Sequence, residues 1–89
     1  MGVNYEISKE ADIELYRAMR YFKLYNKETS FMDDLLNHLC VICLMPKAFQ
    51  LRYKNVRIVN LEHFNFSIHY TIYHERIVIL RIINQNQDF

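Results

Sequence analysis

Residues 66–73 of the chain read Phe66-Ser67-Ile68-His69-Tyr70-Thr71-Ile72-Tyr73. Large apolar side chains occupy every second position from Phe66 to Ile72, and smaller or more polar residues separate them. This alternation is the period of a β-strand that is covered on one face only. The stretch therefore predicts a strand that rests on a hydrophobic core with one face and presents His69, as a solvated surface histidine, on the other.

The segments on either side of this stretch also predict strands. Residues 76–83 are almost all apolar, which is typical of a central strand. The connection His74-Glu75 is short enough for a tight hairpin turn. Residues 56–61 form another β-like run and are joined to residue 66 through a four-residue connection. The C-terminal half therefore predicts three antiparallel strands in sequence order.

The N-terminal half of the chain predicts two helices. Apolar residues at spacings of three and four predict a first helix over residues 9–25, with Ser8 as its N-cap. A second apolar stripe begins after Ser30, which has Asp33 at the spacing of a capping box. Pro46 ends this second helix because proline cannot donate the next backbone hydrogen bond. The turn between the helices is short, so they form an antiparallel hairpin.

Residues 3–7 alternate in polarity and predict one further strand at the N-terminus. The predicted fold class is therefore α+β: a two-layer sandwich with an N-terminal strand, an α-helical hairpin, and a three-stranded antiparallel meander that completes a four-stranded sheet. The chain has 89 residues and no linker or repeat, so we expect a single domain over residues 1–89.

The composition is that of a folded protein, with 52% hydrophobic and 24% charged residues. The net charge of +1 makes the chain a poor non-specific binder of polyanions, but residues 45–89 hold six basic and three acidic residues, which allows a local basic patch. No apolar run is long enough to span a membrane, and the N-terminus does not resemble a signal peptide. With two cysteines in the chain, we expect a reducing, cytoplasmic location.

Several kinds of chemistry are excluded by the sequence. Cys40 and Cys43 have C-x-x-C spacing but fall late in an apolar helix, so we expect ordinary buried thiols. No second pair of ligands accompanies them for zinc. The single glycine, Gly2, excludes a glycine-rich phosphate loop. We therefore expect neither a metal nor a cofactor.

The stretch Phe49-Gln50-Leu51-Arg52-Tyr53-Lys54-Asn55-Val56-Arg57 places three cations among aromatic and apolar residues. Arginine and lysine in such a pattern contact phosphates or the carboxylates of a partner protein. Charged residues also keep an exposed strand edge soluble. From the residues alone, both interpretations of this stretch stay open.

This stretch, together with Phe64-Asn65-Phe66-Ser67-Ile68-His69-Tyr70 and Ile77-Val78-Ile79-Leu80, resembles the RelE/ParE superfamily of bacterial toxins. The likeness covers the whole chain in its order of elements and residues 49–83 in detail. It implies the toxin half of a type II toxin–antitoxin system, associated with growth inhibition and plasmid stabilisation. The toxin of such a pair is neutralised by a cognate antitoxin whose tail wraps it.

The resemblance also implies site residues. RelE-like members cut messenger RNA in the ribosome, and ParE-like members block DNA gyrase. As a ribonuclease, the chain would use Lys54, Arg57 and Arg81 as catalytic cations, with His63 and Tyr70 as weaker candidates for proton transfer. As a binder of a macromolecular target, it would use Arg52, Lys54 and Arg57.

The C-terminus departs from the superfamily pattern. Members often end with a histidine followed by one or two arginines, whereas this chain ends Asn84-Gln85-Asn86-Gln87-Asp88-Phe89. Asparagine and glutamine neither titrate near neutral pH nor carry charge. The departure favours a ParE-like toxin over a RelE-like messenger RNA endoribonuclease. A degenerate, non-toxic partner-binding module is the third interpretation.

The expected partners follow from these interpretations. They are a cognate antitoxin and, as target, DNA gyrase or the ribosome with its messenger RNA. A second copy of the chain is a further expected partner, in a homodimer, and no membrane is involved.

Overall fold

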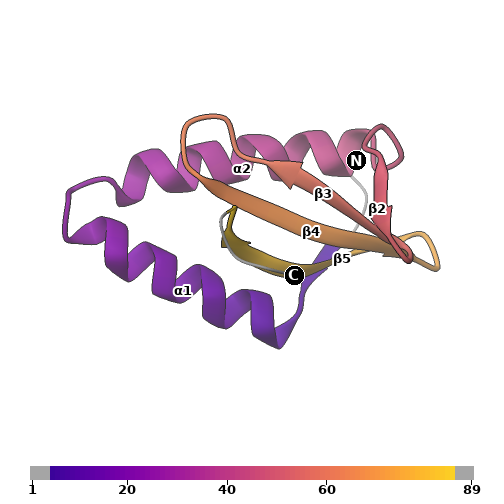
Figure 1. Cartoon of the computed structure of the whole chain (residues 1–89), viewed down its shortest axis with the longest axis horizontal. Coiled ribbons are helices and arrows are strands. Elements are labelled where there is room, and N and C mark those ends of the chain that lie inside the picture. The colour runs from indigo at the N-terminus through magenta and orange to yellow at the C-terminus, as the bar shows by residue number, and fades with distance from the viewer. Residues whose placement is uncertain (1–4, 86–89) are drawn as a thin grey trace.

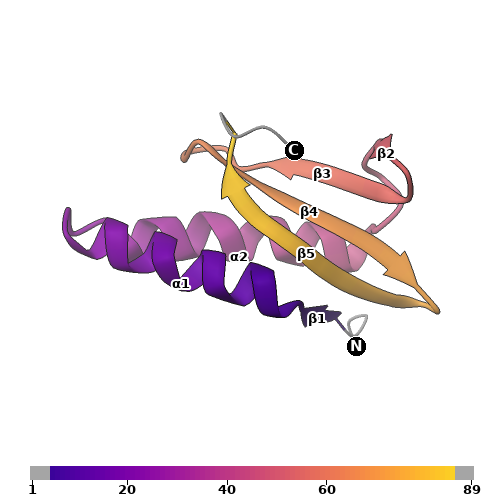
Figure 2. The ribbon, with the colours of Figure 1, turned by 60° about the horizontal axis from the view of Figure 1, so that its bottom comes forward.

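Two helices cover one face of a five-stranded sheet in the computed structural model, which describes residues 5–85 (Figures 1 and 2). The elements are β1 (Tyr5–Ile7), α1 (Lys9–Lys23), α2 (Glu28–Leu44), β2 (Leu51–Tyr53), β3 (Val56–Asn60), β4 (Phe66–Tyr73) and β5 (Arg76–Asn84). The predicted α+β class, its two layers and the helical hairpin are confirmed. Val3 and Asn4 of the predicted first strand lie outside the described residues.

The strands are ordered β1-β5-β4-β3-β2 across the sheet. Strands β2 to β5 pair antiparallel, and β1 lies at the other edge, parallel to β5. The predicted count of four strands is one short, because β2 forms an additional edge strand beside β3. The chain reverses at Lys54, whose φ of 46° is in the left-handed region that tight turns use. The basic stretch over residues 49–57 is therefore bent into a hairpin.

The predicted N-terminal caps of the two helices are confirmed for α1 but not for α2. Ser8 caps α1 as predicted, because its Oγ accepts a hydrogen bond of 3.1 Å from the backbone N–H of Ala11. The prediction of a cap at Ser30 is wrong: α2 begins at Glu28, and its N-cap Lys27 makes no side-chain capping hydrogen bond. Tertiary packing rather than a capping box sets this end, since Phe31 in the first turn is fully buried.

The hydrophobic core lies between the helices and the sheet, and it is richest in aromatic residues at the end where the helical hairpin turns. The ring of Phe31 stacks on that of Phe22 with centroids 4.7 Å apart. Phe64 and Phe66 from the sheet side meet Phe31 edge-on at 5.4 and 5.3 Å. The buried carboxylate of Asp34 on α2 accepts a 2.8 Å hydrogen bond from the backbone N–H of His63 and so anchors the β3–β4 loop.

An irregularity in β5 decides which way the end of this strand faces. Tyr70 lies opposite Ile79 and His69 opposite Arg81, so Leu80 is an extra residue on β5, as in a β-bulge. In a regular strand Arg81, two positions after Ile79, would point to the same face as Ile79 and so into the core. The bulge instead places Arg81 on the face of the sheet opposite the helices, which we call the outer face.

The two cysteines are free, and they differ in exposure. Cys43 is half-buried, and burial raises the pKa of its thiol, with a further contribution from Cys40. The prediction of buried thiols is wrong for Cys40, which is exposed on the side of α2 turned away from the core. In the described part of the chain, no three His, Cys, Asp or Glu side chains gather closely enough to hold a metal ion. None of the helices there has the length and apolarity needed to cross a bilayer.

Candidate functional site

The hairpin over residues 49–57, which we call the cationic hairpin, presents two exposed cations. Arg52 lies in β2 and Lys54 in the turn that follows it. Across residues 5–85, no carboxylate lies within ion-pair distance of Arg52, Lys54 or Arg57. The hydroxyl of Thr71 donates a 2.9 Å hydrogen bond to the carbonyl of Asn55 and holds the turn against β4. The cations are therefore available to an anionic partner on a turn that has a defined position.

Arg57 and Tyr70 lie opposite each other and point to the helix side of the sheet. Arg57 Nε donates a 2.7 Å hydrogen bond to the carbonyl of Phe49, and the Tyr70 hydroxyl donates one of 2.6 Å to the carbonyl of Pro46. Both side chains thus tie the connection after α2 to the sheet. Tyr70 is fully buried, and burial raises the pKa of its phenol, with an opposing contribution from Arg57. Its geometry is that of a core tyrosine with a satisfied hydroxyl.

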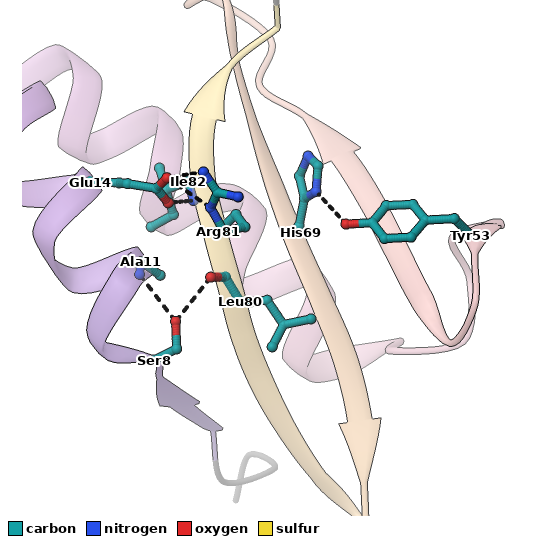
Figure 3. A network of polar contacts seen from close by, with 8 residues as sticks. All are labelled: Ser8, Ala11, Glu14, Tyr53, His69, Leu80, Arg81 and Ile82. Carbon is teal, nitrogen blue, oxygen red and sulfur yellow. Dashed lines mark hydrogen bonds and ion pairs between the residues drawn. The ribbon is translucent and has the colours of Figure 1, made fainter. Parts of the chain in front are cut away.

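His69 lies on the outer face, beside Tyr53 from the cationic hairpin (Figure 3). The Tyr53 hydroxyl is 3.3 Å from His69 Nδ1 in a hydrogen bond, and the ring centroids are 6.2 Å apart. The expectation of a solvated histidine is wrong, since His69 is 0% exposed. The curled-over edge strand β2 brings Tyr53 across this part of the outer face. Tyr53 itself is 39% exposed and is the part of the pair that a ligand can reach.

Arg81 lies on the other side of His69 and is held by Glu14 of α1 (Figure 3). Glu14 Oε2 accepts hydrogen bonds of 2.8 Å from Arg81 Nε and 2.6 Å from Arg81 Nη2. Glu14 Oε1 accepts a third, of 2.9 Å, from the backbone N–H of Ile82. Arg81 retains 37% of its side-chain exposure, so one part of the guanidinium is fixed and another faces solvent.

The protonation states of this cluster follow from its surroundings. Burial lowers the pKa of His69, the positive charge of Arg81 lowers it further, and Glu14 opposes both. The hydrogen bond to Glu14 raises the pKa of Arg81. At neutral pH the site therefore combines the neutral imidazole of His69, the hydroxyl of Tyr53 in contact with it, and the guanidinium cation of Arg81. Such a set can contact an anion and pass a proton between Tyr53 and His69.

His63 lies apart from these residues, on the loop between β3 and β4. Its imidazole is 70% exposed and 3.9 Å from the Glu62 carboxylate. It borders a groove of about 670 Å³ between α1 and this loop. Arg17 and Lys27 contribute cations to the groove, and Tyr21, Phe22, Phe64 and Phe66 contribute aromatic rings.

The candidate site residues named from the sequence lie in different parts of the structure. Lys54 lies in a turn, Arg57 and Tyr70 point to the helix side, Arg81 points to the outer face, and His63 borders the groove beside α1. The residues that do meet on the outer face are Tyr53, His69, Arg81 and Glu14. No local pattern identifies the roles of Tyr53 and Glu14, because both act on residues far along the chain.

Comparison with known proteins identifies the fold. A chain of the solved structure described as "Chromosomal ParDE TA system from P. aeruginosa" superposes on this chain with a TM-score of 0.73. The two are 16% identical, and the match covers 92% of this chain and 95% of that chain. No family model matches the sequence, and no curated protein matches it. The shared fold agrees with the architecture that the resemblance to RelE/ParE toxins implies.

Proposed function

We propose that this chain is the toxin of a type II toxin–antitoxin system, of ParE-like type, acting in the cytoplasm. It binds a macromolecular target such as DNA gyrase and is neutralised by a cognate antitoxin. The observation that carries the proposal is the shared fold over nearly the full length of both chains with a chain of a ParDE system. The sequence likeness over residues 49–83 supports it independently.

Target binding is assigned in this proposal to the cationic hairpin. Arg52 and Lys54 are exposed and face no carboxylate among the described residues. Arg57 contributes indirectly, because its hydrogen bond to the backbone carbonyl of Phe49 holds the base of the hairpin in place. An uncompensated pair of cations on a fixed turn favours an acidic protein surface or a phosphate backbone as partner.

Antitoxin binding is assigned to the groove beside α1. Its aromatic residues offer apolar contacts, and Arg17 and Lys27 offer charge complementarity to acidic residues. Cations flanking an apolar groove suit an antitoxin segment that combines acidic and apolar side chains.

The test of target binding compares growth after induced expression of wild-type chain and of the double variant Arg52→Gln, Lys54→Asn. Asparagine is chosen at position 54 because it tolerates the left-handed conformation of the turn. The matched control is Arg20→Gln, Lys23→Gln, which removes two exposed cations from α1. We expect the wild type and the control to arrest growth and the hairpin variant to lose at least tenfold in toxicity, which corresponds to a loss of about 1.4 kcal/mol or more in target affinity.

Two biochemical readouts identify the target in the same experiment. Inhibition of DNA supercoiling by purified gyrase, with messenger RNA left intact on ribosomes, is the expected result. Unaffected growth, with supercoiling and translation both intact, contradicts the toxin proposal and favours a non-toxic partner-binding module.

A messenger RNA endoribonuclease is the second candidate function, and the outer-face cluster is the observation that favours it. Cleavage requires removal of a proton from the 2′-oxygen as it attacks phosphorus, and stabilisation of the charge that develops on the phosphate. Tyr53 and His69 are in contact and would transfer the proton. Arg81 lies beside them and would stabilise the charge on the phosphate. Lys54 approaches from the same hairpin as Tyr53, while Arg57, Tyr70 and His63 act elsewhere in the fold.

The substitutions Tyr53→Phe and His69→Gln separate the two candidates. A gyrase inhibitor that binds through Arg52 and Lys54 retains its activity in Tyr53→Phe, because the exposed cations are unchanged. A ribonuclease that depends on the outer-face cluster loses cleavage in both variants while folding is verified by circular dichroism.

A further inference from the structure

The turn between α1 and α2 carries two large apolar side chains that are open to solvent. Leu24 is 79% exposed and Tyr25 is 58% exposed, and they directly follow the last residue of α1. The turn projects beyond the end of the sheet in both views, so these side chains stand on a convex end of the molecule (Figures 1 and 2). We call the stretch from Arg20 to Lys27 the helical tip.

The backbone of the helical tip is hydrogen-bonded within the tip itself. The N–H groups of residues 24–27 all donate to carbonyls of the last turn of α1, over 2.9–3.2 Å. Asn26 has a φ of 56°, in the left-handed region, and completes the reversal of the chain. Because these four N–H groups are paired, the tip can enter a medium that contains little water without losing their hydrogen bonds.

A chain of aromatic contacts holds the helical tip to the core. The ring centroids of Tyr25 and Tyr21 are 5.2 Å apart, and those of Tyr21 and Phe22 are also 5.2 Å apart. Phe22 in turn stacks on the buried ring of Phe31. Tyr25 is therefore part of a packed cluster, and its exposure belongs to a surface with a defined shape.

The same region is basic. Residues 15–27 contain no Asp or Glu and four exposed basic residues: Arg17, Arg20, Lys23 and Lys27. Among residues 5–85, no carboxylate lies within ion-pair distance of any of the four. Glu28, the next residue along the chain, is half-buried. The helical tip therefore surrounds its apolar side chains with uncompensated positive charge.

The combination of charge and convex apolar surface narrows the kind of partner. Positive charge alone suits any polyanion. An apolar side chain on a convex tip, however, needs a pocket in a protein partner, whereas the boundary of a lipid bilayer accepts it directly. Tyrosine is typical of this boundary because its ring is apolar and its hydroxyl is polar. Neighbouring lysine and arginine side chains are attracted to anionic headgroups.

We propose that the helical tip binds the surface of an anionic lipid bilayer, with Leu24 and Tyr25 inserted at the level of the headgroups. The three nearest cations contact the lipid phosphates: Arg20, Lys23 and Lys27. The sequence-based expectation that no membrane is involved concerned a spanning segment, which a peripheral contact does not require. The tip lies at the opposite end of the molecule from the β2–β3 turn (Figures 1 and 2). The inference therefore goes beyond the proposed toxin function and does not depend on it.

Co-sedimentation with lipid vesicles tests the contact. The full chain is mixed with vesicles of phosphatidylcholine, or of phosphatidylcholine with about one-third phosphatidylglycerol, at about 0.1 M salt. We expect binding to the anionic vesicles only. Arg20→Gln, Lys23→Gln is expected to weaken this binding by about tenfold or more, because two charges near the surface are lost. The matched control Arg52→Gln, Lys54→Asn removes two exposed cations at the other end of the molecule and leaves binding unchanged.

A single tryptophan shows whether the tip inserts. The chain has no tryptophan, so the tryptophan fluorescence of Tyr25→Trp comes from the tip alone. With anionic vesicles we expect the emission to move to shorter wavelength and to be quenched by brominated acyl chains. Tyr73→Trp, at another exposed tyrosine, is the control and shows neither change.

The apolar contribution is measured separately. Leu24→Gln is expected to weaken vesicle binding about fivefold, because the leucine side chain no longer leaves water. Leu44→Gln, at an exposed leucine of α2, is the matched control and leaves binding unchanged. Circular dichroism checks that each variant is folded.

Four results would overturn the inference. The first is a chain that does not distinguish the two kinds of vesicle. The second is vesicle binding that the tip variants retain or that the hairpin variant loses equally. The third is fluorescence of Tyr25→Trp that does not change on binding. The fourth is a tip that binds a single-stranded oligonucleotide but no vesicle, which would make nucleic acid the partner. Loss of toxicity is a separate readout, because Arg20→Gln, Lys23→Gln is expected to lose vesicle binding and to keep toxicity.

Discussion

His69 is fully buried on the outer face of the sheet, where Tyr53 and Arg81 lie on either side of it. The alternation of residues 66–73 correctly separates the core-facing side chains of β4 from the others. It treats the second face as solvent, however, and this face is covered where Tyr53 and Arg81 flank the histidine. A strand pattern reports the side on which a residue lies, but it does not report what a distant edge strand places on top of it.

The lowered pKa of His69 predicts a pH dependence of stability. At pH values above the ordinary histidine pKa of 6.5, His69 is neutral in both the folded and the unfolded chain, and it contributes no pH dependence to stability. Below that value the unfolded chain binds a proton that the folded chain does not bind until its own, lower pKa is reached. The free energy of unfolding is therefore expected to decrease as the pH falls through this window.

Urea unfolding at a series of pH values measures this contribution. In His69→Gln the part of the slope that comes from this residue disappears, although the variant is less stable at every pH because a buried group is altered. His38→Gln serves as the comparison, since His38 lies in another part of the fold and contacts the buried carboxylate of Asp34. A slope that is unchanged in His69→Gln but lost in His38→Gln would contradict the prediction.

At the scale of elements, α1 takes over the pairing of β5 where β1 ends. β1 pairs with β5 over three residues, Tyr5 to Ile7. Beyond it, the Ser8 backbone N–H donates to the carbonyl of Ile79 at 2.9 Å, and the Ser8 hydroxyl donates to that of Leu80 at 2.9 Å. Glu14 then accepts from the N–H of Ile82. Side chains of the capping residue and of the helix thus satisfy a strand edge that would otherwise be open.

Substitutions at Glu14 separate its two roles. Glu14→Ala removes the acceptor of a backbone N–H and the partner of Arg81, and we expect it to lower the free energy of unfolding by about 2 kcal/mol. Glu14→Gln keeps an acceptor oxygen and loses the ion pair. We expect a smaller loss of about 0.5–1 kcal/mol, because Arg81 is more than one-third exposed and the pair is partly screened.

Urea denaturation measures both losses, with Asp12→Asn on the exposed side of α1 as the control for removal of a carboxylate. Equal destabilisation by Glu14→Ala and Glu14→Gln would show that the charge, rather than the cap on β5, carries the effect.

The long elements of the fold are predictable from the sequence, and the short ones are not. Both helices and strands β3 to β5 bury a periodic set of apolar side chains, and periodicity is a local property. β2 has three residues, all exposed, and exists through its pairing with β3. The bulge at Leu80 is likewise hidden, because almost every residue around it is apolar. The outer-face cluster depends on both β2 and the bulge at Leu80. The sequence therefore indicates candidate cations but does not indicate which of them lie together.

At the scale of the whole molecule, one aromatic cluster joins the two layers. Phe22 and Phe31 come from the two helices, and Phe64 and Phe66 come from the β3–β4 loop and β4. Every pair that includes Phe31 has its ring centroids within 5.4 Å. A domain of 89 residues buries a smaller share of its surface than larger domains do, so a single cluster of this size accounts for much of its stability.

Phe31→Ala is therefore expected to unfold a large fraction of the protein. Truncation of a fully buried phenylalanine costs about 3–5 kcal/mol, and the total stability of a small domain is about 5 kcal/mol. Phe31→Leu keeps most of the volume and is expected to cost about 1–2 kcal/mol. Tyr73→Ala, which truncates an aromatic residue that is 64% exposed, is the control and is expected to cost less than about 0.5 kcal/mol. Circular dichroism during urea denaturation measures the free energy of unfolding of all three variants. A loss below about 1 kcal/mol in Phe31→Ala would contradict the prediction. The helical hairpin would then be held to the sheet mainly by other contacts, such as those of Asp34 and Glu14.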